Sequence, residues 1–221
     1  MECKNGTLTE DEARHWLFIC YDTARSTELI RARHHRKHQQ RQKKNKHSYE
    51  VACQAISRLI NDYSAPLDED NESHDILRNA IKTLKEVLDL NPDAWGAMWF
   101  IGKAYQILGT NEVSLHWFEK AFEENPEHPD VLREAGIQAC KVGNGEAAEK
   151  YTVAALSLSP NDTGLIGNLA LALLIQGRVE EARSAVEGAI SIDPTDDVNK
   201  SVLQLVKEVQ DGQCVCPDRI V

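Results

Sequence analysis

Residues 95–128 read WGAMWFIGKAYQILGTNEVSLHWFEKAFEENPEH, and this stretch decides the fold because the chain repeats its pattern. Two further segments of the same length follow it: PDVLREAGIQACKVGNGEAAEKYTVAALSLSPND, residues 129–162, and TGLIGNLALALLIQGRVEEARSAVEGAISIDPTD, residues 163–196. The period is therefore 34 residues. A fixed period of about this length is typical of arrays of stacked helix pairs.

The three segments agree at places that determine helix length and helix packing. The eighth place is small (Gly102, Gly136, Ala170), the fifteenth is Gly (Gly109, Gly143, Gly177), and the thirty-second is Pro (Pro126, Pro160, Pro194). The Gly at the fifteenth place ends the first helix, and the Pro stops the second helix. The small residue lets the two helices of a pair approach closely. Because one pair buries too little apolar surface alone, the pairs are expected to stack.

This pattern resembles the tetratricopeptide repeat family over residues 95–196. The resemblance implies an all-α fold, a right-handed superhelical array of antiparallel helix pairs. The predicted repeats are 95–128, 129–162 and 163–196.

Residues 48–94 are predicted to form a divergent helix pair that precedes these repeats. Its first helix is EVACQAISRLIND, residues 50–62, and its second is NAIKTLKEVLDLNP, residues 79–92. The sequence between them is acidic and implies an insertion of 11 residues relative to the repeat pattern. After the third repeat, an apolar stripe predicts a capping helix over 197–210. Residues 211–221 are expected to be a flexible tail.

Residues 1–47 are predicted to form an extra N-terminal helix that includes a basic segment. Thr9 and Glu12 have the spacing of a capping box, so the helix should begin near residue 10. Its apolar face, which includes Trp16 and Leu17, is expected to pack on the array. A homodimer formed through this helix is the alternative.

Composition and motifs limit the class of protein. The chain has a formal net charge of -10 and is 42% hydrophobic, as in soluble globular proteins. It has neither a run of about 18 apolar residues nor an export signal, so we expect a cytoplasmic protein with reduced cysteines. No phosphate loop, nucleophile elbow or catalytic cluster is recognisable, which predicts a protein that is not an enzyme and needs no cofactor. The Cys214/Cys216 pair is a weak metal or redox signal.

The resemblance implies that a partner peptide or helix binds in the concave groove lined by the first helices of the pairs. The groove residues predicted in this way are Trp99, Phe100, Lys103, Gln106, Arg133, Ile137, Cys140, Lys141, Asn168, Leu171 and Leu174. Their composition favours an apolar or amphipathic segment that carries some acid, with Trp99 as its main anchor. We therefore expect an adaptor or a chaperone-like binder. The alternative is that the N-terminal helix folds into the groove and covers it.

One specialised groove type fits poorly. Members of the family that bind acidic chaperone tails use a clamp of Lys, Arg and Asn residues for two carboxylates. Asn168 occupies a suitable place, but Arg133 and Ile137 stand where that clamp needs Lys and Asn. A clamp of this type is not expected.

The segment RARHHRKHQQRQKKNKH, residues 31–47, suggests a second kind of function. It holds eight Lys or Arg and four His, and it has no acid. The cations most suited to an anion contact are Arg36, Lys37, Arg41, Lys43 and Lys44. A nucleic-acid or anionic-surface factor that uses this helix, with the repeats as scaffold, is therefore the alternative function. The absence of interleaved aromatic residues weakens the nucleic-acid hypothesis. The alternative is an internal role, in which the segment pairs loosely with the acidic insertion. His34 and His38 have metal-ligand spacing, but the cations around them disfavour a metal.

Overall fold

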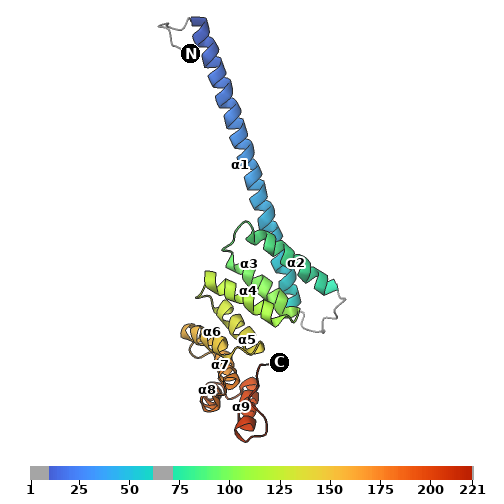
Figure 1. Ribbon diagram of the computed structural model, residues 1–221, viewed down its shortest axis with the longest axis vertical. Coiled ribbons are helices and arrows are strands. Elements are labelled where there is room, and N and C mark those ends of the chain that lie inside the picture. Colours follow the sequence, from blue (N-terminus) through green and yellow to red (C-terminus); the bar gives the residue numbers. More distant parts are fainter. Residues whose placement is uncertain (1–9, 62–71, 221) are drawn as a thin grey trace. The chain divides into compact units, whose positions relative to one another are not determined.

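The computed structural model describes residues 10–61 and 72–220, with side chains described from Ala32 onward except those of His34, His38, Arg41 and Asn61. The chain divides into two compact units, with the boundary between Ser48 and Tyr49. We describe each unit by itself (Figure 1).

All regular structure in the described ranges is helical, as predicted. The helices are α1 (Glu10–Asn61), α2 (Glu72–Leu88), α3 (Trp95–Ile107), α4 (Asn111–Glu124), α5 (Pro129–Lys141), α6 (Gly145–Leu158), α7 (Thr163–Ile175), α8 (Val179–Ile192) and α9 (Asp197–Gln210). Helix α1 begins at Glu10, where the capping box predicted it, and runs without a break through the basic segment. The side chains of its predicted apolar face lie outside the described residues.

The glycines and prolines of the repeats act as the sequence predicted. Helices α3, α5 and α7 are each followed by a Gly with positive φ: Gly109 (+72°), Gly143 (+80°) and Gly177 (+73°). Glycine adopts this left-handed conformation without the steric cost that a Cβ brings. Helices α4, α6 and α8 end at Glu124, Leu158 and Ile192, and Pro follows each of these residues at the second position. The alternation of helices and turns is thus set locally.

Close packing within a pair depends on the small eighth place. A Cβ added to Gly102 would lie 2.8 Å from the ring of Phe118, and one added to Gly136 would lie 2.8 Å from Thr152 Oγ1. Phe118 is completely buried. The prediction that this place allows the helices to approach is confirmed.

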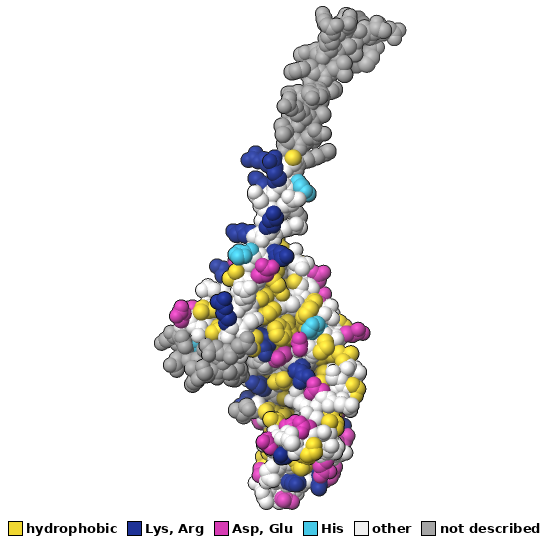
Figure 2. All heavy atoms as spheres, turned by 180° about the vertical axis from the view of Figure 1, so that it is seen from behind, with side chains coloured by type: hydrophobic (Ala, Val, Ile, Leu, Met, Phe, Trp, Pro, Cys, Tyr) yellow, Lys and Arg dark blue, Asp and Glu magenta, His cyan; other side chains and the backbone are white. Residues whose placement is uncertain are grey.

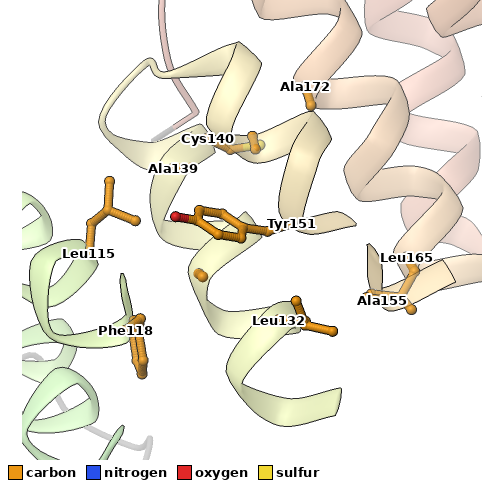
Figure 3. Packing of buried hydrophobic residues seen from close by; sticks show 11 residues of the cluster. Leu115, Phe118, Leu132, Ala139, Cys140, Tyr151, Ala155, Leu165 and Ala172 are labelled. Atoms are coloured by element: carbon orange, nitrogen blue, oxygen red, sulfur yellow. The ribbon is translucent and has the colours of Figure 1, made fainter. Parts of the chain in front are cut away.

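Successive pairs share one apolar core. Buried residues of α4, α5, α6 and α7 form a cluster that includes Phe118, Leu132 and Tyr151 (Figure 3). A second cluster joins the end of α1 to α2 and α3 and includes Ile56 and Leu77. A third joins α7, α8 and α9. Each cluster uses helices from neighbouring pairs, as the stacking prediction requires.

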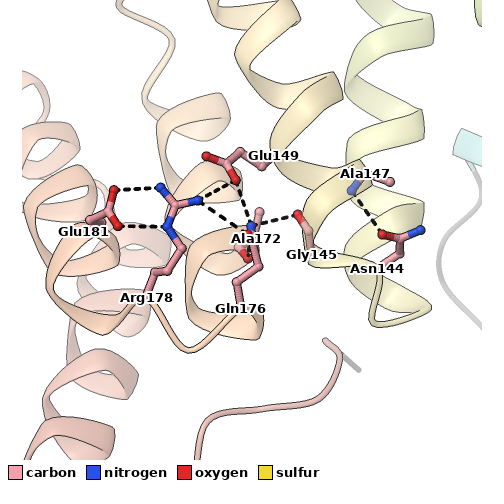
Figure 4. Close-up of polar contacts among 8 residues, drawn as sticks. All are labelled: Asn144, Gly145, Ala147, Glu149, Ala172, Gln176, Arg178 and Glu181. Carbon is pink, nitrogen blue, oxygen red and sulfur yellow. Dashed lines mark hydrogen bonds and ion pairs between the residues drawn. The ribbon is translucent and has the colours of Figure 1, made fainter.

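Polar contacts also fix the spacing between neighbouring pairs (Figure 4). Gln176, after α7, donates to the carbonyl of Gly145 at 3.1 Å and to Glu149 at 2.9 Å. Arg178 donates to Glu149 and to Glu181, both at 2.7 Å. The turn between α7 and α8 is thereby held against the start of α6.

The second helix of the divergent pair begins earlier than the predicted start at residue 79. Helix α2 begins at Glu72, so the last part of the insertion is helical, and Asp75 pairs with Arg78 at 3.1 Å in the same helix. Acidic residues in a first turn interact favourably with the helix dipole, which accounts for this extension. The other acids of the insertion lie outside the described residues, and so does their predicted pairing with the basic segment.

Candidate peptide-binding groove

The first helices of the pairs line one face of the array. Helix α5 packs against α7, and α7 packs against α9, whereas the second helices α4, α6 and α8 do not pack closely against one another. Helices α5, α7 and α9 therefore lie on the inner side of the array, and α3 joins them through Lys103, which lies 2.9 Å from Glu134 on α5. We call the face formed by α3, α5 and α7 the groove.

The groove presents partly exposed side chains at equivalent places. The ninth place of each repeat holds Lys103, Ile137 and Leu171, and the sixth place holds Phe100 and Asn168 on α3 and α7; all five are partly exposed. Ile137 belongs to none of the buried clusters, whereas Leu171 packs against two of them. These five predicted residues thus lie together on one face. Among the apolar ones, Ile137 is the one that packs on no core cluster.

Trp99 is part of the groove wall. Its ring packs against two core clusters and meets Phe100 edge-on, with the ring centroids 5.0 Å apart. Its indole N–H is buried and finds no hydrogen-bond partner in the described part of the chain. Trp99 therefore supports the fold as well as the groove surface.

The positive charge expected from Lys103 and Arg133 is offset by neighbouring acids. Lys103 Nζ lies 2.9 Å from Glu134, in side chains that are only 12% and 15% exposed, and Gln106 donates to the same carboxylate at 3.0 Å. Arg133 pairs with Asp162, whose other oxygen accepts the N–H of Leu165 and caps α7. These two acids are structural partners that the sequence prediction omitted.

Asp162 could have been found from sequence, because it stands where Asp is favoured as a helix N-cap. Burial acts to raise the pKa of its carboxyl, but the hydrogen bonds from Leu165 N–H and Arg133 lower the pKa more, and the net shift is downward. Glu134 stands at the sixth place of its repeat, a place on the groove face, but its pairing with Lys103 had no signal in the sequence. Lys141, which is partly exposed, makes no ion pair or hydrogen bond with the described residues.

Two predicted groove residues are not on the surface. Cys140 is 3% exposed and Leu174 is completely buried, so the prediction that they are exposed is wrong. Both side chains belong to core clusters built from several helices, on which Ile220 and Cys216 of the chain after α9 also pack. Burial raises the pKa of the Cys140 thiol to about 12, so the thiol stays protonated at neutral pH.

The cations of the basic segment are on the surface of the other unit. Arg36, Lys37, Lys43 and Lys44 are exposed, and dark blue side chains stand out along this part of α1 in Figure 2. The side chain of Arg41 lies outside the described residues. Arg36 donates to the carbonyl of Ala32 in its own helix at 3.4 Å.

No described helix combines the length and the apolar character needed to cross a bilayer. No three His, Cys, Asp or Glu side chains in the described ranges lie close enough together to hold a metal ion.

Comparison with protein families identifies the repeats. Two models of the tetratricopeptide repeat match the chain, one over residues 96–128 and one over residues 133–197. The two matches cover the predicted repeats, and the second ends one residue after them, at Asp197. A search of curated proteins finds no match.

Solved structures with the same fold share little sequence with the chain. MamA 41-end from Desulfovibrio magneticus RS-1 is similar with a TM-score of 0.61 and 18% identity, over 74% of this chain and 86% of that one. YrrB, described as a TPR protein with an unusual peptide-binding site, is similar with a TM-score of 0.56 and 20% identity, over 73% of this chain and 86% of that one. At these identities the similarity concerns the fold alone.

Proposed function

The chain is a tetratricopeptide repeat protein, and on that premise we propose that it is a protein-interaction module whose groove binds an extended or helical segment of a partner protein. In this role the protein acts as an adaptor or a chaperone-like binder. Repeat arrays offer long inner surfaces that suit such segments.

One observation carries the proposal. Partly exposed apolar side chains recur on the first helices of successive pairs: Phe100 on α3, Ile137 on α5 and Leu171 on α7. The second helices of the pairs do not contribute to this row, because they lie on the outer side of the array. A row of apolar side chains with polar neighbours is the usual composition of a surface that binds a peptide.

The charges of the groove favour a partner that is mainly apolar. Lys103 and Arg133 already have acidic partners within the array. An acidic ligand would have to displace those carboxylates from Lys103 and Arg133. The carboxylate of the ligand would lose its hydration, and the number of charge pairs would not increase. We therefore revise the expected ligand to an apolar or amphipathic segment, with Lys141 and Asn168 as its polar contacts.

The proposal can be tested by affinity capture with the full chain. The double variant Ile137→Ser/Asn168→Ala changes two groove side chains that are partly exposed, so it should leave the fold intact and weaken capture of the partner at least about tenfold. Val153→Ser is the matched control, since Val153 lies on α6, is 49% exposed and is outside the groove. Loss of the partner with Val153→Ser but not with the groove variant would reject the proposal.

A second candidate function is supported by the exposed cations of α1. A nucleic acid or another anionic surface could bind Arg36, Lys37, Lys43 and Lys44, with affinity that falls as salt rises. The two candidates are separated by capture with a variant in which these four residues are Gln. A partner that is retained by the groove variant and lost by the Gln variant would favour this second function.

A further inference from the structure

The chain after α9 folds back on the array as an extended segment. Gly212, with φ of +70°, ends α9, and the N–H groups of Gln213 and Cys214 donate to the carbonyl of Glu208 at 2.8 and 3.2 Å. The segment then turns toward α5, as Figure 1 shows at the C-terminal label. We call residues 214–220 the return segment.

Two apolar side chains and one main-chain hydrogen bond hold the return segment. The N–H of Ile220 donates to the carbonyl of Cys140 at 3.1 Å. The Ile220 side chain packs on the α4–α7 cluster, and Cys216 packs on the α7–α9 cluster. The same carbonyl also accepts the N–H of Gly143 at 3.1 Å, so the end of α5 and the return segment share one acceptor.

Comparison of the three repeat glycines shows that the contact is specific to the second pair. A Cβ on Gly143 would clash with the carbonyl oxygen of Asp218, whereas a Cβ on Gly109 or on Gly177 would meet nothing within 4 Å. All three glycines have nearly the same positive φ. Of these three positions, only that of Gly143 needs glycine for two reasons: its backbone conformation and the close approach of another main chain.

Apart from Cys216 and Ile220, the return segment has mostly exposed side chains. Val215 is 87% exposed, and the residues from Val215 to Arg219 form no hydrogen bond or ion pair with other described residues. Asp218 and Arg219 are also exposed, and their charged groups form no ion pair with the described residues of the array. A segment with so few buried contacts belongs to the least stable part of a structure, where local opening is easy.

We propose that the end of α5, formed by the Cys140 carbonyl, the Gly143 backbone and the apolar surface beside them, is a binding subsite for an extended main chain with an aliphatic side chain, and that Ile220 fills it as an internal ligand. An external segment of this chemistry competes with the return segment. The subsite needs no charge on the ligand. The inference deepens the proposed function, on which it rests, because it extends the same face toward α9 and makes access to it depend on displacement.

Competition by a tethered segment has a predictable size. A short tether holds its ligand at an effective concentration in the millimolar range, so an external peptide must exceed that concentration or bind more tightly. Releasing the tether by a point change should therefore strengthen binding of an external peptide at least about tenfold.

Thiol labelling of the full chain can test the subsite, because Ile220 donates to the carbonyl of Cys140 and packs on the cluster that holds its side chain. In Ile220→Ser, alkylation of Cys140 should be at least about tenfold faster than in the parent chain, while alkylation of buried Cys53, in another cluster, should not change. Ile220→Val is the matched control and should keep Cys140 protected. Equal Cys140 rates in the parent and Ile220→Ser, or faster labelling of both cysteines, would overturn the proposal.

The second arm uses a synthetic peptide of residues 213–221 with Cys214→Ser and Cys216→Ala, so that the probe cannot be alkylated. At millimolar concentration it should restore protection of Cys140 in Ile220→Ser. Adding Gly143→Ala to that variant should abolish the effect, whereas Gly177→Ala, which introduces the same backbone strain elsewhere, should not. Lack of protection by the peptide, or equal effects of the two glycine changes, would overturn the subsite.

Failure of this inference and failure of the proposed function are distinguishable. Peptide protection of Cys140 is measured without any partner protein. Partner capture is measured through Ile137 and Asn168, which form no hydrogen bond or ion pair with the described residues of the return segment. Protection without capture would retain the subsite alone, and capture without protection would retain the groove alone.

Discussion

The α3–α5 end and the α7–α9 end of the array share one design for their helix pairs but present different groove surfaces. At the first end, aromatic rings and the Lys103–Glu134 pair form a partly exposed wall. At the second end, aliphatic residues such as Leu174 are buried beside Cys216. The places that set helix length and packing are the same at both ends, so the groove places can vary without changing the fold.

The largest effect is expected from the core of the first end. Phe118→Ala removes a completely buried ring and leaves a cavity beside Gly102, which should lower the free energy of unfolding by about 3–5 kcal/mol. Because each pair contacts only its neighbours, the damage should be local. Hydrogen exchange should show α3 and α4 losing protection before α8 and α9.

The matched control for this change lies on the same helix. Val113 is 40% exposed, so Val113→Ala should alter the free energy of unfolding by less than about 0.5 kcal/mol. Equal loss of exchange protection in α3 and α9 of the Phe118→Ala chain would show that the two ends unfold as one unit.

The polar wall of the first end should give the next largest effect. Glu134→Ala leaves Lys103 and Gln106 without their shared acceptor in a site that is about seven-eighths buried, so it should cost about 2–3 kcal/mol in urea unfolding. Glu187→Ala breaks the exposed Arg183–Glu187 pair and should cost less than about 0.5 kcal/mol. Similar costs for both changes would mean that the wall is no more than a surface ion pair.

The fold was largely predictable because its determinants are local and repeated. The first helix of each pair ends before a glycine with positive φ, at Gly109, Gly143 and Gly177, and the second helix ends before a proline. One period of 34 residues therefore predicts the helix pair that is repeated along the array. The start of α2 was less predictable, since acidic residues such as Glu72 occur equally in loops and in first helical turns.

The groove was predicted only in part because exposure depends on distant segments. Cys140 stands at a place that the helix pattern leaves open, yet it is buried in a cluster on which Ile220, far along the chain, also packs. A short extended segment has no periodicity, so nothing in CVCPDRI predicted its position. Lys103 was placed correctly on the face, but its partner Glu134 depends on the distance between α3 and α5.

Acidification should give a smaller effect that belongs to the junction of α5 and α7. Asp162 has a lowered pKa in the folded chain, so its stabilising contribution is complete above the unfolded pKa of about 4 and is lost as the pH falls through the folded pKa. Asp162→Asn should cost about 1 kcal/mol at pH 7 and less at pH 3, measured by urea unfolding at both values. A cost that is the same at the two pH values would show that the carboxylate charge does not contribute.

The smallest effect is expected from the basic segment, which belongs to neither end of the array. Replacing Arg36, Lys37, Lys43 and Lys44 by Gln should change the free energy of unfolding by less than about 0.5 kcal/mol, because all four side chains are exposed and Gln also favours a helix. Thermal unfolding at low and high salt checks this. A loss above about 1 kcal/mol that appears only at low salt would contradict it, since salt screens pairing between exposed charges. The cations would then stabilise the fold by pairing with acids of this chain. Such pairing would count against the second candidate function, in which they bind an external anion.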